Sequence, residues 1–234
     1  MGGEEVIVQL DLKGDEIVLD AGAGTGRDTI SLLNRLPTGK VIAVDASESM
    51  LAHLTEKLQS YGDRVLVVYS DLIFPFGVDH QCDAVISVAI FHWVKDHQAP
   101  FYNLRRTLKP NGLLVADCGG FGNIERILAA FSTVTKDEIN LEETWNFATP
   151  HETSIRLENC GFENIDVTLV QDPVTSTNRS LFDAFLSTVV LGSPLDSYEQ
   201  LDREKIVTEV IERIGSFTVD FVRLKIRANV AGAA

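Results

Sequence analysis

The pattern of hydrophobic and polar positions in the first half of the chain predicts a parallel β-sheet. Five short, nearly continuous apolar runs are separated by stretches in which apolar residues recur at helical spacing. Strands of a parallel sheet that is covered by helices on both faces have this pattern. The predicted strands are residues 16–20, 41–45, 65–70, 84–90 and 113–117.

Beyond Gly120 helical patterns dominate, and two further strands are expected. One helix is predicted to open at Asn123. Another begins at Thr149, because Thr149 and Glu152 three residues later fit a capping box and Pro150 stands at the first helical position, and it ends near Cys160. Further helices are predicted at about residues 181–191 and 198–214, and the last two strands at about residues 162–170 and 219–230.

Composition and charge narrow the possible partners. The 234 residues are 45% hydrophobic and 23% charged, which is typical of a folded domain. Lys and Arg number 20 against 34 Asp and Glu, a formal net charge of −14. This charge repels phosphate backbones and anionic lipids, so we expect neither a nucleic-acid nor a membrane partner.

The termini and the cysteines add to this picture. The amino terminus lacks the layout of a signal peptide, and no apolar run approaches the ~20 residues needed to cross a bilayer, so a cytoplasmic location is expected. Cys82, Cys118 and Cys160 are widely spaced and form no CxxC pair. We therefore expect buried thiols in a reducing compartment, with neither a disulfide framework nor a metal site.

A glycine-rich loop follows the first predicted strand. The stretch from Asp20 to Gly26 reads DAGAGTG, so a strand ends, three glycines turn the chain and a helix begins. Backbone N–H groups and the helix N-terminus then face a ligand at the carboxyl edge of the sheet. Arg27 stands where a dinucleotide-binding GxGxxG loop has its third glycine, and the Asp20 carboxylate suits an ammonium group better than a pyrophosphate. The loop is thus predicted to bind a cationic amino-acid group.

Two more acids end successive predicted strands. Asp45 can accept hydrogen bonds from both hydroxyls of a ribose, and Asp71 can accept one from an adenine amine. A single aspartate at the end of a strand is more often a cap or turn residue. With Asp20, however, the three acids lie in register along one edge of the sheet, which capping alone does not explain.

These motifs resemble those of the class I S-adenosylmethionine-dependent methyltransferases. The resemblance covers about residues 14–120 and rests on the glycine loop, Asp45, Asp71 with Leu72, and the segment LKPNGL at residues 108–113. It implies an α/β, Rossmann-like, seven-stranded sheet that is mostly parallel with an antiparallel last strand. Helices would cover both faces, with a helical cover from the C-terminal half.

The resemblance also implies the ligand and its contacts. The cofactor would be S-adenosyl-L-methionine and its product S-adenosyl-L-homocysteine. The cofactor-binding residues would be Asp20, Gly22, Ala23, Gly24, Gly26, Asp45, Ala46, Met50, Ser70, Asp71, Leu72 and Val88.

Within this class the chain looks most like the trans-aconitate methyltransferase-type enzymes that act on small molecules. The residues behind this are the segments at 87–94 and 119–123 and the helix start at Thr149. A single domain over residues 1–234 is expected, with a cofactor-binding half at 1–120 and substrate-side helices and the last two strands at 121–234. Relatives carry an extra amino-terminal segment that closes over the cofactor. Only about 15 residues precede the first strand here, so this cover is missing or comes from the later helices.

Candidate acceptor-facing residues follow the fourth predicted strand. His92 is a candidate general base or hydrogen-bond donor, and Trp93 a candidate wall of the acceptor site, although both residues fit a packing role as well. His97 and His151 are expected to be surface or capping residues. The segment Ala89-Ile90-Phe91-His92 is not the Asn/Asp-Pro-Pro-aromatic tetrad of enzymes that methylate base amines.

The C-terminal half is expected to complete the acceptor site. Its candidates are Trp145, Phe147, Arg179 and Arg223. Either arginine could clamp a substrate carboxylate, and either could equally be a surface residue paired with an acid.

The function predicted from these residues is methyl transfer to a small-molecule acceptor, with O-methylation of a carboxylate or hydroxyl favoured. Transfer from a sulfonium needs mainly orientation and exclusion of water, so the lack of a catalytic triad is no objection. A non-catalytic, methyltransferase-like module is the first alternative. A nucleotide-dependent oxidoreductase is the second, which Arg27 disfavours.

Overall fold

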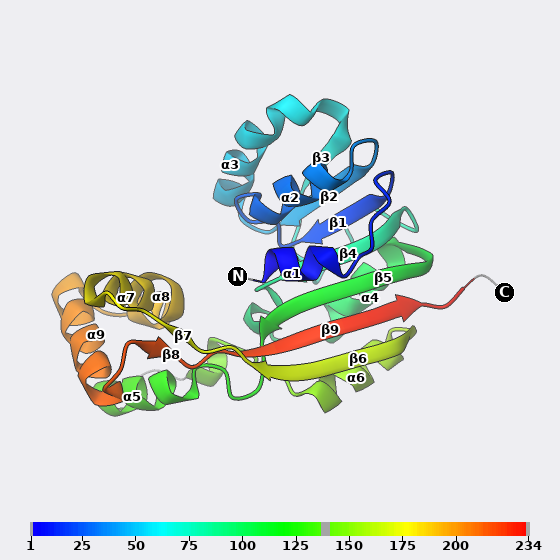
Figure 1. Cartoon of the computed structure of the whole chain (residues 1–234). Coiled ribbons are helices and arrows are strands. Elements are labelled where there is room, and N and C mark those ends of the chain that lie inside the picture. Colours follow the sequence, from blue (N-terminus) through cyan, green and yellow to red (C-terminus); the bar gives the residue numbers. More distant parts are fainter. Residues whose placement is uncertain (1, 137–140, 233–234) are drawn as a thin grey trace.

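A seven-stranded sheet forms the centre of the molecule (Figure 1). The computed structural model describes residues 2–136 and 141–232. The strands stand in the order β3-β2-β1-β4-β5-β9-β6, with β9 antiparallel to both of its neighbours and the other pairs parallel. The predicted Rossmann-like sheet is therefore confirmed. Its strands are β1 (Ile17–Ala21), β2 (Lys40–Asp45), β3 (Val65–Tyr69), β4 (Cys82–Val88), β5 (Leu108–Gly119), β6 (Phe162–Gln171) and β9 (Val222–Val230).

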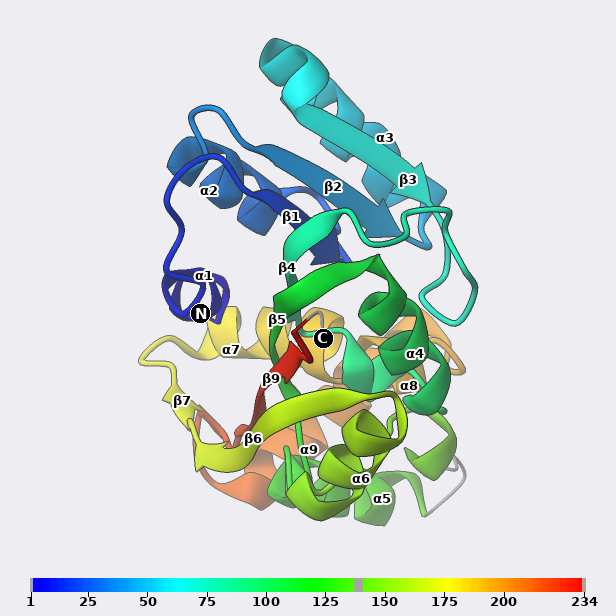
Figure 2. The same ribbon diagram turned by 90° about the vertical axis from the view of Figure 1, so that its right-hand side faces the viewer.

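Helices cover both faces of this sheet, as predicted (Figure 2). On one face α1 (Gly3–Val8), α2 (Arg27–Arg35) and α3 (Glu48–Leu58) bury Ile7, Leu32 and Leu54 in one core cluster. On the other face α4 (Gln98–Thr107) and α6 (Pro150–Asn159) bury Phe101 and Leu157 in a second cluster. The apolar strand residues contribute alternately to the two clusters, which is why both strand faces read as hydrophobic in the sequence.

A helical subdomain lies beyond the carboxyl ends of the parallel strands (Figure 1). It has its own apolar core, in which Phe131, Phe182 and Val210 are fully or almost fully buried. The helical cover expected from the C-terminal half is thus present. The subdomain consists of α5 (Glu125–Thr135), α7 (Arg179–Phe185), the π-helical segment η4 (Leu186–Val190), α8 (Gly192–Leu195), α9 (Gln200–Ile214) and the two-stranded antiparallel sheet of β7 (Val174–Thr175) with β8 (Thr218–Val219).

The last predicted strand is wrong in its extent. Residues 219–230 were expected to be continuous, but Val219 belongs to β8 and pairs with Val174, whereas β9 begins at Val222. Tertiary hydrogen bonds interrupt the strand at Asp220. Its carboxylate accepts from the Arg126 backbone N–H at 2.8 Å, and its carbonyl accepts from the Ile124 N–H at 3.0 Å. These bonds tie the chain to the start of α5 in place of the sheet ladder.

The three cysteines lie in the environment that was predicted for them. Cys82, Cys118 and Cys160 are free and buried, as expected, and burial raises the pKa of the Cys118 thiol to about 12. Over residues 2–136 and 141–232, no helix combines the length and the apolar character that a membrane span requires.

The first prediction concerns the start of α6. The Thr149 hydroxyl accepts from the Glu152 N–H at 3.2 Å, and the Glu152 carboxylate accepts from the Thr149 N–H at 3.0 Å, so the predicted capping box is confirmed. Thr149→Ala should lower the free energy of unfolding by about 1 kcal/mol, because the Glu152 N–H loses its acceptor and the Glu152 carboxylate loses the hydroxyl that donates to it. Urea unfolding measures this, with Thr149→Ser as the control that keeps the cap. Equal losses in both variants would show that the methyl group matters and the cap does not.

Candidate active site

The glycine loop between β1 and α2 is fixed by the end of β2. The Gly22 and Ala23 N–H groups both donate to the Val44 carbonyl, at 2.8 and 3.0 Å. Gly22 has φ 86°, and a Cβ there would lie 2.1 Å from Cγ1 of Ile90, so only glycine fits. Gly26 has φ 88° and packs against Leu54 in the same way, with 2.3 Å between a built Cβ and Cδ1. The loop therefore lies close both to α3 and to the segment that follows β4.

Asp45 connects this loop to the start of α3. One carboxylate oxygen accepts from the Gly24 N–H at 2.8 Å, and the other accepts from the Ser47 N–H at 2.9 Å. The residue is half-buried at the carboxyl end of β2. Each oxygen keeps a further lone pair, so Asp45 can accept two more hydrogen bonds from a ligand.

Asp20 lies beneath the loop. Its side chain is 2% exposed and accepts from the Thr29 hydroxyl at 2.6 Å. Burial raises the pKa of Asp20 to about 7, with smaller contributions from the Asp28 and Asp45 carboxylates. A cation bound at the loop would favour the ionised carboxylate and lower this pKa.

The acids and apolar residues beyond β2 and β3 form the next part of the edge. The Ser70 N–H donates to the Asp45 carbonyl at 3.0 Å, which places the chain after β3 beside the end of β2. Asp71 is exposed and accepts from the Ile73 N–H at 3.1 Å. Leu72 is buried, whereas Ala46 and Met50 are exposed at the start of α3. The predicted adenosine-contacting residues are thus neighbours along one edge of the sheet.

A cleft of about 590 Å³ opens where α1, the ends of β4 and β5, and the helical subdomain meet. Gly2 of the segment before α1 and Phe185 of α7 both line it, so the cleft is covered from the amino-terminal side and by the later helices. The apolar lining residues are Val88, Ala89, Val170, Phe185 and Phe221. The charged ones are Glu5, Arg27, Asp117, Asp172, Arg223 and Lys225.

A buried ion pair crosses the floor of this cleft. Arg223 of β9 donates from Nε to the Asp117 carboxylate of β5 at 2.6 Å, and their side chains are 16% and 4% exposed. Burial raises the pKa of Asp117, and Arg223 opposes this rise. Arg223 is therefore both paired and part of the cleft. Arg179, the other predicted clamp, lies elsewhere: it is half-exposed on α7, 3.8 Å from Asp183.

The predicted aromatic candidates gather in one cluster, but none of them is among the residues that line the cleft. The His92 ring lies 6.1 Å from the Phe147 ring, which stacks on Trp145 with 5.9 Å between centroids. Trp93 is 45% exposed and 5.9 Å from Trp145. Residues from two distant segments, 91–93 and 145–147, thus form one cluster.

His92 is a neutral side chain. Its Nδ1 accepts from the Gly119 N–H at 3.3 Å, which leaves the proton on Nε2. Burial lowers the pKa of His92 to about 3, and the nearby Arg223 adds to this effect. A group this weakly basic is a poor general base at neutral pH but can donate a hydrogen bond from Nε2.

His97 was predicted to be a surface or capping histidine, and the surface part of this expectation is wrong. The residue occupies the N-cap position of α4, but it is 1% exposed and its side chain makes no capping hydrogen bond. Its ring packs edge-on against Phe101, and Nε2 bonds to the Phe91 carbonyl at 2.8 Å. Tertiary packing of the β4–α4 connection draws it inside.

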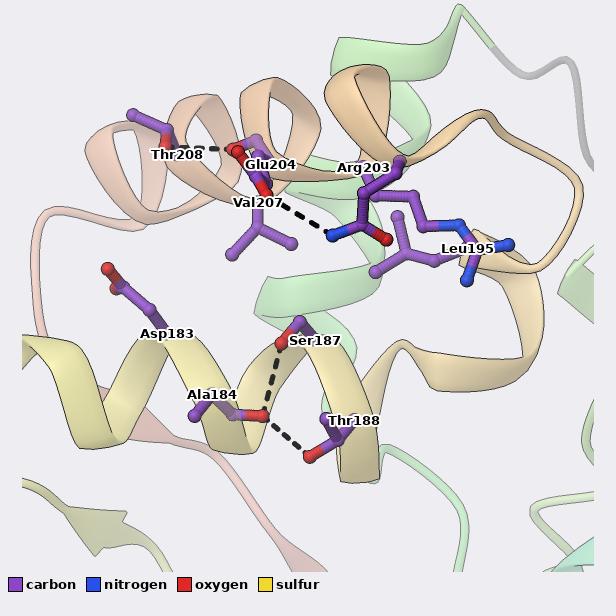
Figure 3. A pocket seen from close by; sticks show the side chains of 10 residues that line it. Asp183, Ala184, Ser187, Thr188, Leu195, Arg203, Glu204, Val207 and Thr208 are labelled. Carbon is purple, nitrogen blue, oxygen red and sulfur yellow. Dashed lines mark hydrogen bonds between the residues drawn. The ribbon is translucent and has the colours of Figure 1, made fainter.

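A second hollow, of about 500 Å³, lies between α7 with η4 and α9 (Figure 3). It shares no lining residue with the cleft. The Ser187 and Thr188 hydroxyls both donate to the Ala184 carbonyl, and the Thr208 hydroxyl donates to the Glu204 carbonyl. Because these hydroxyls serve the helices themselves, the glycine loop and the cleft beside it are the better candidate site.

Several cleft residues were not predicted from the sequence. Asp117 carries the same signal as Asp45 and Asp71, an aspartate at the end of a predicted strand, and could have been found. Glu5 and Lys225 pair at 3.0 Å but lie at opposite ends of the chain. In the described part of the chain, no group of three or more His, Cys, Asp or Glu side chains is arranged to hold a metal ion.

Comparison with known proteins agrees with this geometry. A family profile described as "Methyltransferase domain" matches residues 18–112. The chain is 30% identical over 132 residues to a malonyl-[acyl-carrier protein] O-methyltransferase of Xylella fastidiosa, a match that covers 55% of this chain and 44% of that protein. It is 33% identical over 111 residues to a trans-aconitate 2-methyltransferase of Variovorax paradoxus, covering 47% of this chain and 41% of that protein. The chain thus spans less than half the length of these two relatives.

Solved structures share the whole fold. The YcgJ protein of Bacillus subtilis superimposes with a TM-score of 0.70 over 99% of this chain and 98% of its own. The two sequences are 16% identical, so this likeness concerns the fold alone.

The second prediction concerns the buried Asp20. Its pKa is about 7 in the folded chain, whereas an unfolded chain has an Asp pKa of about 4. Between these values the folded chain holds a proton that the unfolded chain has released, so the contribution of Asp20 to stability is present at low pH and is lost as pH rises through about 7. Asp20→Asn removes this dependence.

We therefore expect the stability of Asp20→Asn relative to the parent to grow from pH 5.5 to pH 7.5 and then level off. Urea unfolding at a series of pH values measures the difference. Thr29→Val removes the hydrogen bond that lowers the Asp20 pKa. When both chains carry Thr29→Val, the stability difference between them should therefore level off at a higher pH. A difference independent of pH would mean that Asp20 is ionised throughout.

Proposed function

We propose that this chain, whose residues 18–112 match a methyltransferase-domain profile, transfers a methyl group from S-adenosylmethionine to a carboxylate oxygen of a small organic acid. One observation carries this proposal. The glycine loop and Asp45 are joined by the Gly24 N–H to Asp45 hydrogen bond of 2.8 Å, and they stand next to the cleft that contains Arg223.

The residues along the sheet edge fit the parts of this cofactor. We assign the ribose hydroxyls to the free lone pairs of Asp45 and the adenine amine to Asp71. Ala46, Met50, Ser70 and Leu72 would surround the adenine, and Val88 would lie near the sulfonium. Asp20, beneath Gly22, Ala23, Gly24 and Gly26, would supply negative charge near the ammonium group. The bound cofactor supplies an electrophilic methyl group with a good leaving group.

The cleft would hold and orient the acceptor. The neutral His92 supports a role as hydrogen-bond donor, and Trp93, Trp145 and Arg223 remain proposed acceptor contacts. An acceptor carboxylate is already ionised at neutral pH, so its methylation needs no general base. A histidine with a pKa of about 3 therefore fits a carboxylate acceptor better than a hydroxyl.

The relatives support this choice of acceptor. One is named a malonyl-[acyl-carrier protein] O-methyltransferase and the other a trans-aconitate 2-methyltransferase, so both names describe methylation of an acid. We also propose one domain with a cofactor-binding half at residues 1–120 and an acceptor half beyond it. A small-molecule acceptor, rather than nucleic acid, agrees with the net charge of −14.

The third prediction tests the cofactor site. Asp45→Ala should weaken binding of S-adenosylmethionine by about 1–3 kcal/mol, because the ribose hydroxyls lose a charged acceptor. Isothermal titration calorimetry measures this, and Asp63→Ala, at an exposed position in η1 (Gln59–Arg64), is the matched control. No binding by the parent chain, or equal binding by Asp45→Ala and the parent, would contradict the proposal.

The fourth prediction separates the two roles of His92. If it donates a hydrogen bond, the turnover rate should not change with its protonation between pH 6 and 8, and His92→Phe should lower kcat about tenfold without altering the pH profile. Steady-state assays at saturating cofactor measure both. A parent profile that rises through pH 6 to 7 and becomes flat in the variant would identify a general base instead.

A further inference from the structure

Arg223 is the most deeply placed cation of the cleft. Its side chain is 16% exposed, against 34% for Lys225 and 64% for Arg27. The Nε and Nη2 groups of Arg223 both donate to a single carboxylate oxygen of Asp117, Oδ1. In the described part of the chain the Nη1 donors have no partner, so the guanidinium can bind one more carboxylate oxygen pair or a single oxygen.

The other charges of the cleft are balanced. Arg27, Arg223 and Lys225 face Glu5, Asp117 and Asp172 around its wall. Arg223 is paired with Asp117, Lys225 with Glu5 at 3.0 Å, and Arg27 with Asp28 at 2.9 Å, so every lining cation already has an acid partner. A first ligand carboxylate can use the remaining Arg223 donors. A second or third carboxylate would find only Lys225 and Arg27, which are paired and more exposed to water than Arg223, and it would meet three acids of like charge.

The remainder of the wall is apolar. Phe185 of α7 and Phe221, between β8 and β9, meet edge to face with 6.3 Å between ring centroids. Val170 at the end of β6 is 38% exposed on the same wall. These side chains can pack against the acyl or aryl part of a ligand. A polyacid could not use this apolar contact.

We propose that the acceptor is an organic acid with a single carboxylate on an apolar body, bound by Arg223 through the carboxylate and by Phe185 and Phe221 through the body. This inference rests on the proposed methyl transfer. It separates this chain from an enzyme for a tricarboxylic acid. Asp117 is a positioning residue in this arrangement, because it fixes the guanidinium and cancels its charge.

Three acids with six carbon atoms test this inference. Hexanoate, adipate and propane-1,2,3-tricarboxylate carry one, two and three carboxylates on similar skeletons. Each is titrated calorimetrically into the chain saturated with S-adenosylhomocysteine, and again into the free chain. Hexanoate should bind at least tenfold more tightly than either polyacid. Tighter binding of adipate or of the tricarboxylate, or no binding of any acid while S-adenosylhomocysteine binds, would overturn the inference and leave the cofactor assignment intact.

Variants connect the preference to named residues. Arg223→Gln should abolish hexanoate binding, and Asp117→Asn with Arg223→Gln should do the same without leaving a buried unpaired acid. Phe185→Ala should weaken hexanoate at least fivefold and propionate less than twofold. Arg179→Gln, which lies outside the cleft, is the matched control. Thermal melts confirm that each variant is folded, and unchanged hexanoate binding in the folded double variant would refute the role of Arg223.

The two proposals fail in distinguishable ways. If S-adenosylhomocysteine does not bind but hexanoate is still preferred, the methyltransferase function is refuted and the acid-binding cleft is supported. If neither S-adenosylhomocysteine nor any of the three acids binds, both proposals are refuted.

Discussion

The position of the glycine loop depends on the end of β2. Val44 and Asp45 are consecutive residues, and together they accept hydrogen bonds from Gly22, Ala23 and Gly24. This is possible because β1 and β2 pair in parallel with Ala21 opposite Val44, so both strands end at the same edge. The register of one strand pair thereby brings the loop, the ribose-binding candidate and the start of α3 together. A shift by one residue would turn Asp45 toward the opposite face.

This arrangement buries charged side chains, which costs free energy. Asp20 and Asp117 are both almost fully buried, in a chain that already carries a formal net charge of −14. A buried ion pair such as Asp117 with Arg223 is often no more stable than an apolar replacement, because both groups lose their hydration. Asp20 has no cationic hydrogen-bond partner in the described residues and has a raised pKa. Both features have a clear use if a cation binds at the loop and an anion binds at Arg223.

Local patterns explain why much of the fold could be predicted. The apolar runs, the glycine loop and the capping box at Thr149 each act within a few residues, so the sequence contains them whole. The break before β9 could not be predicted, because it depends on the Asp220 hydrogen bonds with residues almost a hundred positions away. The burial of His97 has a different cause, because the Phe91 and Phe101 rings and the Phe91 carbonyl that enclose it lie within six residues of it. The irregular connection between β4 and α4 has no periodic pattern from which this packing could be predicted. Likewise, nothing near Glu5 in the sequence indicates Lys225.

The acceptor site has to be inferred from this chain's own residues. The family profile ends at residue 112, and the two curated relatives match about half of this chain. Asp117, Phe185, Phe221, Arg223 and Lys225 all lie beyond that point. The shared part thus supplies the loop and the acids that suit the cofactor, while most of the cleft wall comes from the part that the profile does not cover. The relatives therefore support an acid as the acceptor, while the pairing of Arg223 and the apolar wall beside it decide which kind of acid fits.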